Sequence, residues 1–147
     1  MSRPILIDFD SDHRKKTPLK IVELHAASRP ELLNEEWIVV ENGGGNSVGV
    51  RGCSLTVAAG EQRRPHSLTT IEPGFILEAG MRVRLVSGAP AKKAQGAPPV
   101  ESDEVKNYHL FLKESYLGAP GLVVRLTIRQ LDLAHAVFAP ESPNGVV

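Results

Sequence analysis

Three aspartates near the N-terminus are the first residues whose types and spacing could do chemistry. Asp8, Asp10 and Asp12 alternate with other residues directly after a short apolar run. Carboxylates at this spacing begin calcium-binding loops, but such loops also need glycine at the sixth position and glutamate at the twelfth. His13 and Leu19 occupy those positions. We therefore expect a solvated extension without a bound metal, and keep a metal-dependent site at the three aspartates as an alternative.

A run of three glycines raises a second option, a loop that binds phosphate. Loops of the Walker type need Gly-x-x-x-x-Gly-Lys-Ser/Thr between a strand and a helix. The stretch from Gly43 to Gly49 contains no lysine, and Val48 to Leu55 is β-branched and broken by turn residues rather than helical. We predict that Asn42–Asn46 is instead a hairpin turn, which sets the register of Trp37–Glu41 against the segment that follows.

The single cysteine, Cys53, is the third candidate, as a nucleophile brought to a histidine by folding. No two of the five histidines lie within ten residues of each other, so the sequence contains no local histidine pair for zinc. Cys53 lies between Gly52 and Ser54 without a flanking basic cluster, which favours a small buried core residue. We predict no catalytic residue, no cofactor and no enzymatic activity.

The elements that would position these residues are strands. Polar and apolar residues alternate in Met81–Val86 and Val124–Arg129, as in strands with one dry and one wet face. Similar short runs recur between turn signals. They are Lys20–Leu24, Trp37–Glu41, Ser54–Ala58, Ser67–Thr70, Phe75–Leu77, Tyr108–Leu112 and Leu133–Phe138. The pattern predicts an all-β fold, an immunoglobulin-like antiparallel β-sandwich of about seven to nine strands.

The chain of 147 residues fits one domain. We divide it into a polar N-terminal extension at 1–18, a sandwich domain at 19–139 and a C-terminal tail at 140–147. The longest stretch without a pattern, residues 89–107, is rich in alanine, proline, lysine and glycine. We expect it to form a long mobile loop within the domain.

Four arginines supply a candidate binding face. Arg82, Arg84, Arg125 and Arg129 fall on the predicted wet faces of two strands. If those strands share a sheet, the arginines form a basic stripe that could contact phosphates, so a nucleic-acid-associated binding module is one alternative. The chain balances 17 basic against 17 acidic residues, which favours an ordinary solvated face.

Several segments resemble the lamin-tail domain family. Asn34–Asn42 resembles its opening, an Asn/Asp-Glu pair, an aromatic residue, a hydrophobic strand and a glycine-containing turn. Val50–Leu55 follows the family pattern with Cys53 in place of tryptophan, and Phe75–Gly88 resembles its next strand segment. Tyr116–Leu126 resembles the final hairpin but lacks its Gly-Asp pair. The resemblance implies an immunoglobulin-like sandwich without catalytic residues that binds proteins, nucleic acid or envelope components.

Taken together, the sequence favours a non-catalytic protein-interaction or scaffold module of lamin-tail type. We expect a protein partner, whose identity the sequence does not give, and a homo-oligomer through a sheet edge as a further option. The apolar run Ile5–Ile7 ends at Asp8, too short for an export signal, and no apolar stretch approaches a membrane span. We therefore expect a cytoplasmic protein.

Overall fold

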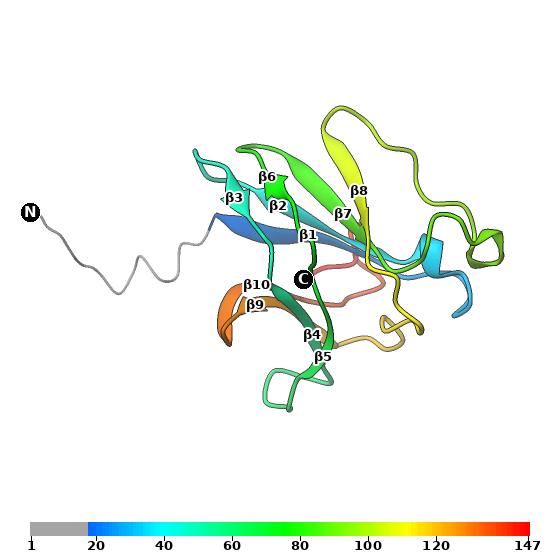
Figure 1. Cartoon of the computed structure of the whole chain (residues 1–147). Helices are drawn as coiled ribbons and strands as arrows, with labels where there is room; N and C mark the ends of the chain where they lie inside the picture. The colour runs from blue at the N-terminus through cyan, green and yellow to red at the C-terminus, as the bar shows by residue number, and fades with distance from the viewer. Residues whose placement is uncertain (1–17) are drawn as a thin grey trace, which may run out of the picture.

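Two four-stranded sheets pack face to face in the computed structural model, which describes residues 18–147 (Figure 1). The first sheet has the order β1-β2-β7-β8, with strands Leu19–His25, Trp37–Asn42, Arg82–Val86 and Val105–His109. The second has the order β10-β9-β4-β5, with strands Leu131–Val137, Val123–Ile128, Ser54–Ala58 and His66–Thr70. A short ribbon pairs β3 (Val48–Gly49) with β6 (Ile76–Leu77), and two 3-10 turns are η1 (Leu33–Glu35) and η2 (Lys93–Gln95). The prediction of an all-β sandwich is confirmed.

Alternating side chains from both sheets build the core. Ile38 and Val40 on β2 face inward, as does Leu85 on β7. Leu55 on β4 and Leu126 on β9 meet them from the second sheet, and both are almost fully buried. Burying a side chain of this size contributes about 1.5–3 kcal/mol. The alternation read from the sequence therefore has a direct physical cause, since one face of each sheet lies against the other sheet.

One strand pairing departs from the predicted antiparallel arrangement. β7 and β8 are parallel, with Arg82 opposite Val105 and Val86 opposite His109. Parallel neighbours need a long crossover, and the segment between these strands provides it. The predicted loop at 89–107 thus contains η2 and the start of β8, and it packs on the outer face of the first sheet. There Asn107 Nδ2 donates to the Pro99 carbonyl at 2.7 Å.

The glycine run is a turn, but not the predicted hairpin. β2 pairs with β1 and β7 and does not pair with the segment that follows it, so the predicted register was wrong. The buried Asn42 holds the turn: its Oδ1 accepts from the Gly44 N–H at 3.0 Å. Its Nδ2 donates to the carbonyls of Asn46 at 2.8 Å and Leu77 at 2.9 Å. The turn therefore passes the chain from the first sheet to the β3–β6 ribbon.

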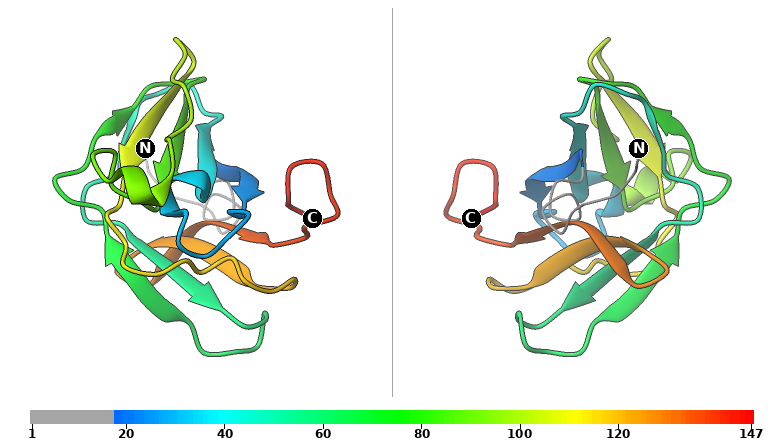
Figure 2. Two further views of the ribbon diagram at one scale, coloured as in Figure 1. Left: turned by 90° about the vertical axis from the view of Figure 1, so that its right-hand side faces the viewer. Right: turned by 90° about the vertical axis from the view of Figure 1, so that its left-hand side faces the viewer.

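The predicted C-terminal tail packs against β1. The N–H of Leu24 donates to the Asn144 carbonyl at 2.9 Å, and the N–H of Ala139 donates to the Gly145 carbonyl at 2.8 Å. Gly145 has a φ of +73°, and a Cβ there would collide with the Leu24 backbone, so the close approach requires glycine. We call residues 139–147 the C-terminal hook; Figure 2 shows it as the loop at the C-terminus.

Candidate binding surface

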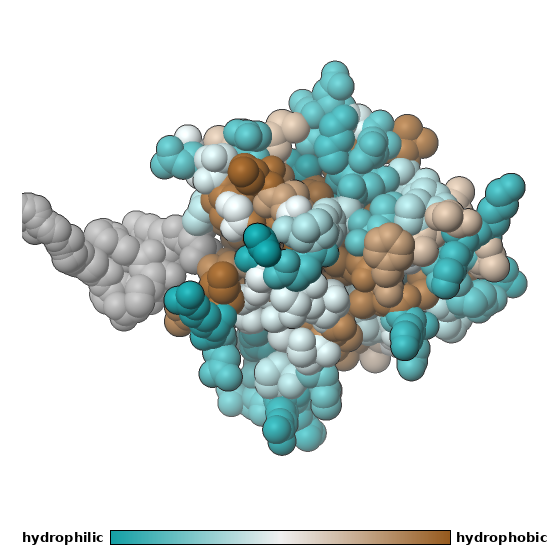
Figure 3. Space-filling view, in the orientation of Figure 1, coloured by the Kyte–Doolittle hydropathy of each residue, from teal (hydrophilic) through white to brown (hydrophobic). Residues whose placement is uncertain are grey.

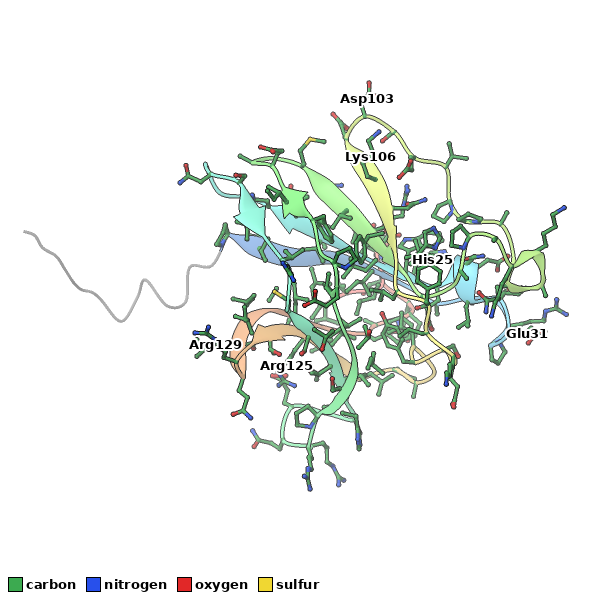
Figure 4. All side chains as sticks on the ribbon, viewed as in Figure 1. His25, Glu31, Asp103, Lys106, Arg125 and Arg129 are labelled. Carbon is green, nitrogen blue, oxygen red and sulfur yellow. The ribbon has the colours of Figure 1, made fainter. Side chains whose placement is uncertain are left out.

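The four predicted arginines do not share a sheet. Arg82 and Arg84 lie on β7 of the first sheet, whereas Arg125 lies on β9 of the second. Arg129 follows β9 in the turn to β10, with a φ of +50°. Figure 4 shows Arg125 and Arg129 together on the second sheet, far from Lys106 on β8. The condition for one continuous basic stripe is therefore not met.

Partners within the protein also engage three of these arginines. Arg84 donates to the Val100 carbonyl at 3.2 Å and to Asn107 Oδ1 at 3.1 Å, and its guanidinium lies 5.7 Å from the Trp37 ring centroid. Arg125 has carboxylates at 3.6 and 3.7 Å, those of Glu61 and Asp132. Arg82 lies 3.8 Å from Glu41. Phosphate would have to compete with these contacts, which reduces the case for a nucleic-acid face.

Cys53 is a core residue. It is 1% exposed, and burial raises the pKa of its thiol, which disfavours the thiolate needed for a nucleophile. No cluster of three or more histidine, cysteine or carboxylate side chains able to hold a metal occurs in residues 18–147. Asp8, Asp10 and Asp12 lie outside the described residues, so the expected absence of a metal there, and the alternative of a metal-dependent site, stay untested.

Glu36 forms a buried polar cluster that the sequence reasoning missed. Its side chain is almost fully enclosed; Oε1 accepts from the Ser87 hydroxyl at 2.7 Å, and Oε2 accepts from the N–H groups of Tyr116 and Leu117, both at 3.1 Å. Burial raises the pKa of the Glu36 carboxyl, against the opposing effect of these hydrogen bonds. The pKa of Tyr116 lies well above its usual value, mainly because its side chain is buried and also because the negative charge of Glu36 is nearby. Ser87 and Glu36 are both buried, so the cluster joins the end of the β2–β7 pair to the segment at Tyr116 and Leu117.

Asn34 extends this polar region to the crossover. Its buried Nδ2 donates to the carbonyls of Ala89 and Gly96, both at 2.9 Å. A Cβ on Gly88 would come within 2.5 Å of Asn34 Oδ1, so this contact also needs a glycine. The start of the crossover is thereby fixed to η1. Asn34 lies in η1 and Glu36 directly precedes β2, both within the segment that resembles the lamin-tail opening.

Two outer sheet edges, those of β1 and β8, already have hydrogen-bond partners from within the chain. On β8, the Asn107 N–H donates to Glu101 Oε2 at 2.7 Å, and Val105 exchanges hydrogen bonds with Ser102. The C-terminal hook covers part of β1. Pro65 precedes β5, whose ladder with β4 is broken by a register shift. Covered edges discourage pairing, so the β1 and β8 edges give no support to the predicted homo-oligomer through a sheet edge, which stays a prediction.

An apolar groove opens between β6 and the β7–β8 pair. Its volume is about 310 Å³, and it is lined by Phe75, Ile76, Leu77, Glu78, Met81, Arg82, Val83, Lys106, Asn107 and Tyr108. The Phe75 and Tyr108 rings lie 4.8 Å apart, centroid to centroid, and Ile76 beside them is 67% exposed. Hydrophobic side chains gather over β6 and β3 in Figure 3. We call this hollow the β6–β8 groove.

A second exposed aromatic, Phe111, offers a weaker surface. It is 65% exposed with a φ of +56°, and hollows of about 320 and 470 Å³ flank it. Polar side chains such as Thr69, Glu72 and Lys113 contribute much of their lining. The lining of the β6–β8 groove is therefore more apolar than that of the hollows beside Phe111.

No family model matches the chain, and no curated protein is detectably similar to it. These comparisons therefore do not assign the chain to a family. Residues 18–147 contain no helix long and apolar enough to cross a membrane.

Proposed function

We propose that this protein is a non-catalytic protein-interaction module of lamin-tail type, and that the β6–β8 groove is its binding surface. The observation that carries the proposal is the 67% exposure of Ile76 at the rim of an apolar hollow. Exposing a large aliphatic side chain beside half-buried aromatic rings leaves apolar area in water that a partner can bury.

The lining of the groove supports binding rather than catalysis. Its polar side chains are Glu78, Arg82, Lys106 and Asn107, and no serine, cysteine or histidine lines it. The lamin-tail resemblance supports the same function, because two of the resembling segments, Asn34–Asn42 and Phe75–Gly88, contribute β2, β6 and β7. A cytoplasmic location remains a prediction from the sequence.

Site-specific photo-crosslinking tests this function. A photoreactive phenylalanine analogue is placed at Ile76 in one variant and at Leu131 in the control, since these two side chains are 67% and 66% exposed. Leu131 begins β10 on the second sheet, away from the groove. After irradiation in the native cells, mass spectrometry identifies peptides joined to each position. We expect a defined partner peptide at position 76 only; the same products at both positions would contradict the proposal.

A further inference from the structure

We propose that the β6–β8 groove is covered, when no partner is bound, by residues 5–9 of the same chain. This inference rests on the proposed function, because both use one groove. It adds a regulatory step, since residues 5–9 must leave the groove before a partner can enter. We call residues 5–9 the apolar segment.

The apolar segment differs from the rest of the N-terminal extension. It reads Ile-Leu-Ile-Asp-Phe, whereas every residue in 10–17 is polar or charged. Side chains alternate between the two faces of an extended chain, so Ile5, Ile7 and Phe9 would share one face. That face carries two aliphatic side chains and an aromatic ring, which are stabilised by any apolar surface that removes them from water. The segment therefore has the chemistry of a ligand for an apolar groove.

The groove offers apolar surface of the matching size. Its volume of about 310 Å³ lies at the lower end of the range for ligand pockets, roughly 300–1,000 Å³, so it takes one or two large side chains. Phe75, Met81 and Tyr108 in its lining are only half buried, and Ile76 at the rim is 67% exposed. Side chains of the apolar segment placed against them would remove apolar surface of both from water.

The described chain begins at the end of the first sheet where the groove opens. β1 runs antiparallel to β2, so the chain enters β1 where β2 ends, and the start of β1 lies on the same side of the molecule as the β3–β6 ribbon (Figure 1). The Pro18 carbonyl accepts from the Gly43 N–H at 2.8 Å. The preceding residue, Asn42, donates to the carbonyls of Met81 at 3.0 Å and Leu77 at 2.9 Å, and both of these residues line the groove. The attachment point of the N-terminal extension is therefore held next to the groove.

The polar residues 10–17 form a tether that is long enough. In the order β1-β2-β7-β8, the far side of the groove lies three strand spacings from β1, about 14–15 Å. An extended tether of this length spans roughly 26–29 Å. It also sets an effective concentration on the order of millimolar, about a thousandfold above that of a second copy at micromolar protein concentration. Weak apolar contacts therefore suffice to keep the segment of the same chain in the groove.

Photo-crosslinking in the purified full chain tests this occupant. The photoreactive phenylalanine analogue is placed at Ile76, or at Leu131 as the control position, in an equal mixture of ¹⁵N-labelled and unlabelled protein. After irradiation and digestion, mass spectrometry should find peptides containing residues 5–9 joined to position 76, with both halves labelled or both unlabelled. Halves of mixed isotope composition would mean that a second copy supplies the segment, which overturns the proposal. Absence of residues 5–9 from the products, or equal yields at positions 76 and 131, also overturns it.

Two double variants test whether the apolar face of the segment is responsible. Ile5→Asp/Ile7→Asp should lower the yield of this crosslink about tenfold, because charged groups resist transfer into an apolar groove. The matched control, Ser11→Asp/Thr17→Asp, adds the same two charges to the polar tether and should keep the yield within about twofold. Equal losses in both variants would show that the apolar face does not hold the segment.

The outcomes separate this inference from the proposed function, because the purified protein contains no partner. If residues 5–9 do not crosslink there, but a defined partner peptide is found at position 76 in the native cells, the proposed function stands and the covering segment is wrong. If residues 5–9 crosslink and no partner peptide is found in the cells, the groove holds only its own chain and the proposed function falls. If neither is found, both proposals fall.

Discussion

The two ends of the central β2–β7 strand pair differ in how their polar groups are used. At one end, Glu36 and Ser87 are enclosed and bonded to each other, and Glu36 also accepts from two backbone N–H groups. At the other end, Arg82 reaches only a weak partner and the apolar β6–β8 groove opens beside it. The same two strands thus have a closed, internally bonded end and an open end beside apolar surface, where Arg82 and Glu41 form an exposed pair.

The difference indicates where stability and binding reside. Donors that lose a buried acceptor cannot turn to water, so changes at the closed end affect folding strongly. Side chains at the open end, such as Ile76, are exposed in residues 18–147 and can be covered by a binding segment. The buried Asn42 lies at the boundary, because it ends β2 and holds the backbone of Leu77 next to the groove.

The substitution Glu36→Ala tests the closed end most severely. It removes the acceptor of three donors at once, and we expect the free energy of unfolding to fall by about 3–5 kcal/mol. Urea denaturation followed by fluorescence measures the change. Glu78→Ala, an exposed glutamate at the open end, is the matched control and should change stability by no more than about 0.5 kcal/mol. Comparable losses in both variants would abolish the distinction between the two ends.

Asn42→Ala should have an intermediate effect. The substitution leaves the carbonyls of Asn46 and Leu77 without their side-chain donor, and the Gly44 N–H without its acceptor. We expect a loss of about 2 kcal/mol in the free energy of unfolding. Because Leu77 lines the groove, crosslinking of a partner at position 76 should weaken too, whereas Glu36→Ala should affect it only through folding. Unaltered binding by a folded Asn42→Ala protein would show that the boundary residue does not organise the groove.

The smallest expected effect at the closed end is the change in the free energy of unfolding with pH as Glu36 titrates. Because burial raises the Glu36 pKa, the folded state binds this proton more tightly than the unfolded state. The resulting stabilisation is complete below the ordinary value of 4.5 and is lost as the pH rises through the raised value.

The substitution Glu36→Gln isolates this titration, since its amide can donate to Ser87 and accept from both N–H groups. Denaturation midpoints between pH 4 and 8 should show the wild type losing stability relative to Glu36→Gln as the pH rises. A difference independent of pH would mean that the Glu36 carboxyl has the same pKa in the folded and the unfolded protein.

The sequence predicts strands well where one face alone is buried. The alternation in Met81–Val86 closely matches β7, because Val83 and Leu85 must face the core while Arg82 and Arg84 face outward. However, the alternation of apolar and polar residues does not specify which strands become neighbours in a sheet. β7 and β9 show similar patterns yet belong to different sheets, so four outward arginines did not make one face.

The candidate site was harder to predict because it depends on contacts between distant residues. The buried state of Glu36 requires Ser87 and the N–H groups of Tyr116 and Leu117, which no local pattern relates to it. Where β8 lies, the sequence predicts the loop 89–107 followed by a strand at Tyr108, because Val105 to His109 lacks clear alternation. The groove itself joins residues of β6, β7 and β8, which only the folded topology brings together.

The C-terminal hook also constrains the order in which the protein can fold. Leu24, near the start of the described chain, completes its backbone hydrogen bonding through Asn144, near its end. Almost every other strand lies between them in sequence, so this contact closes a very long loop, and such contacts slow folding. During synthesis, β1 emerges from the ribosome long before the residues that cover its edge. A nascent chain therefore exposes an uncovered β1 edge until its last strand and hook have been made.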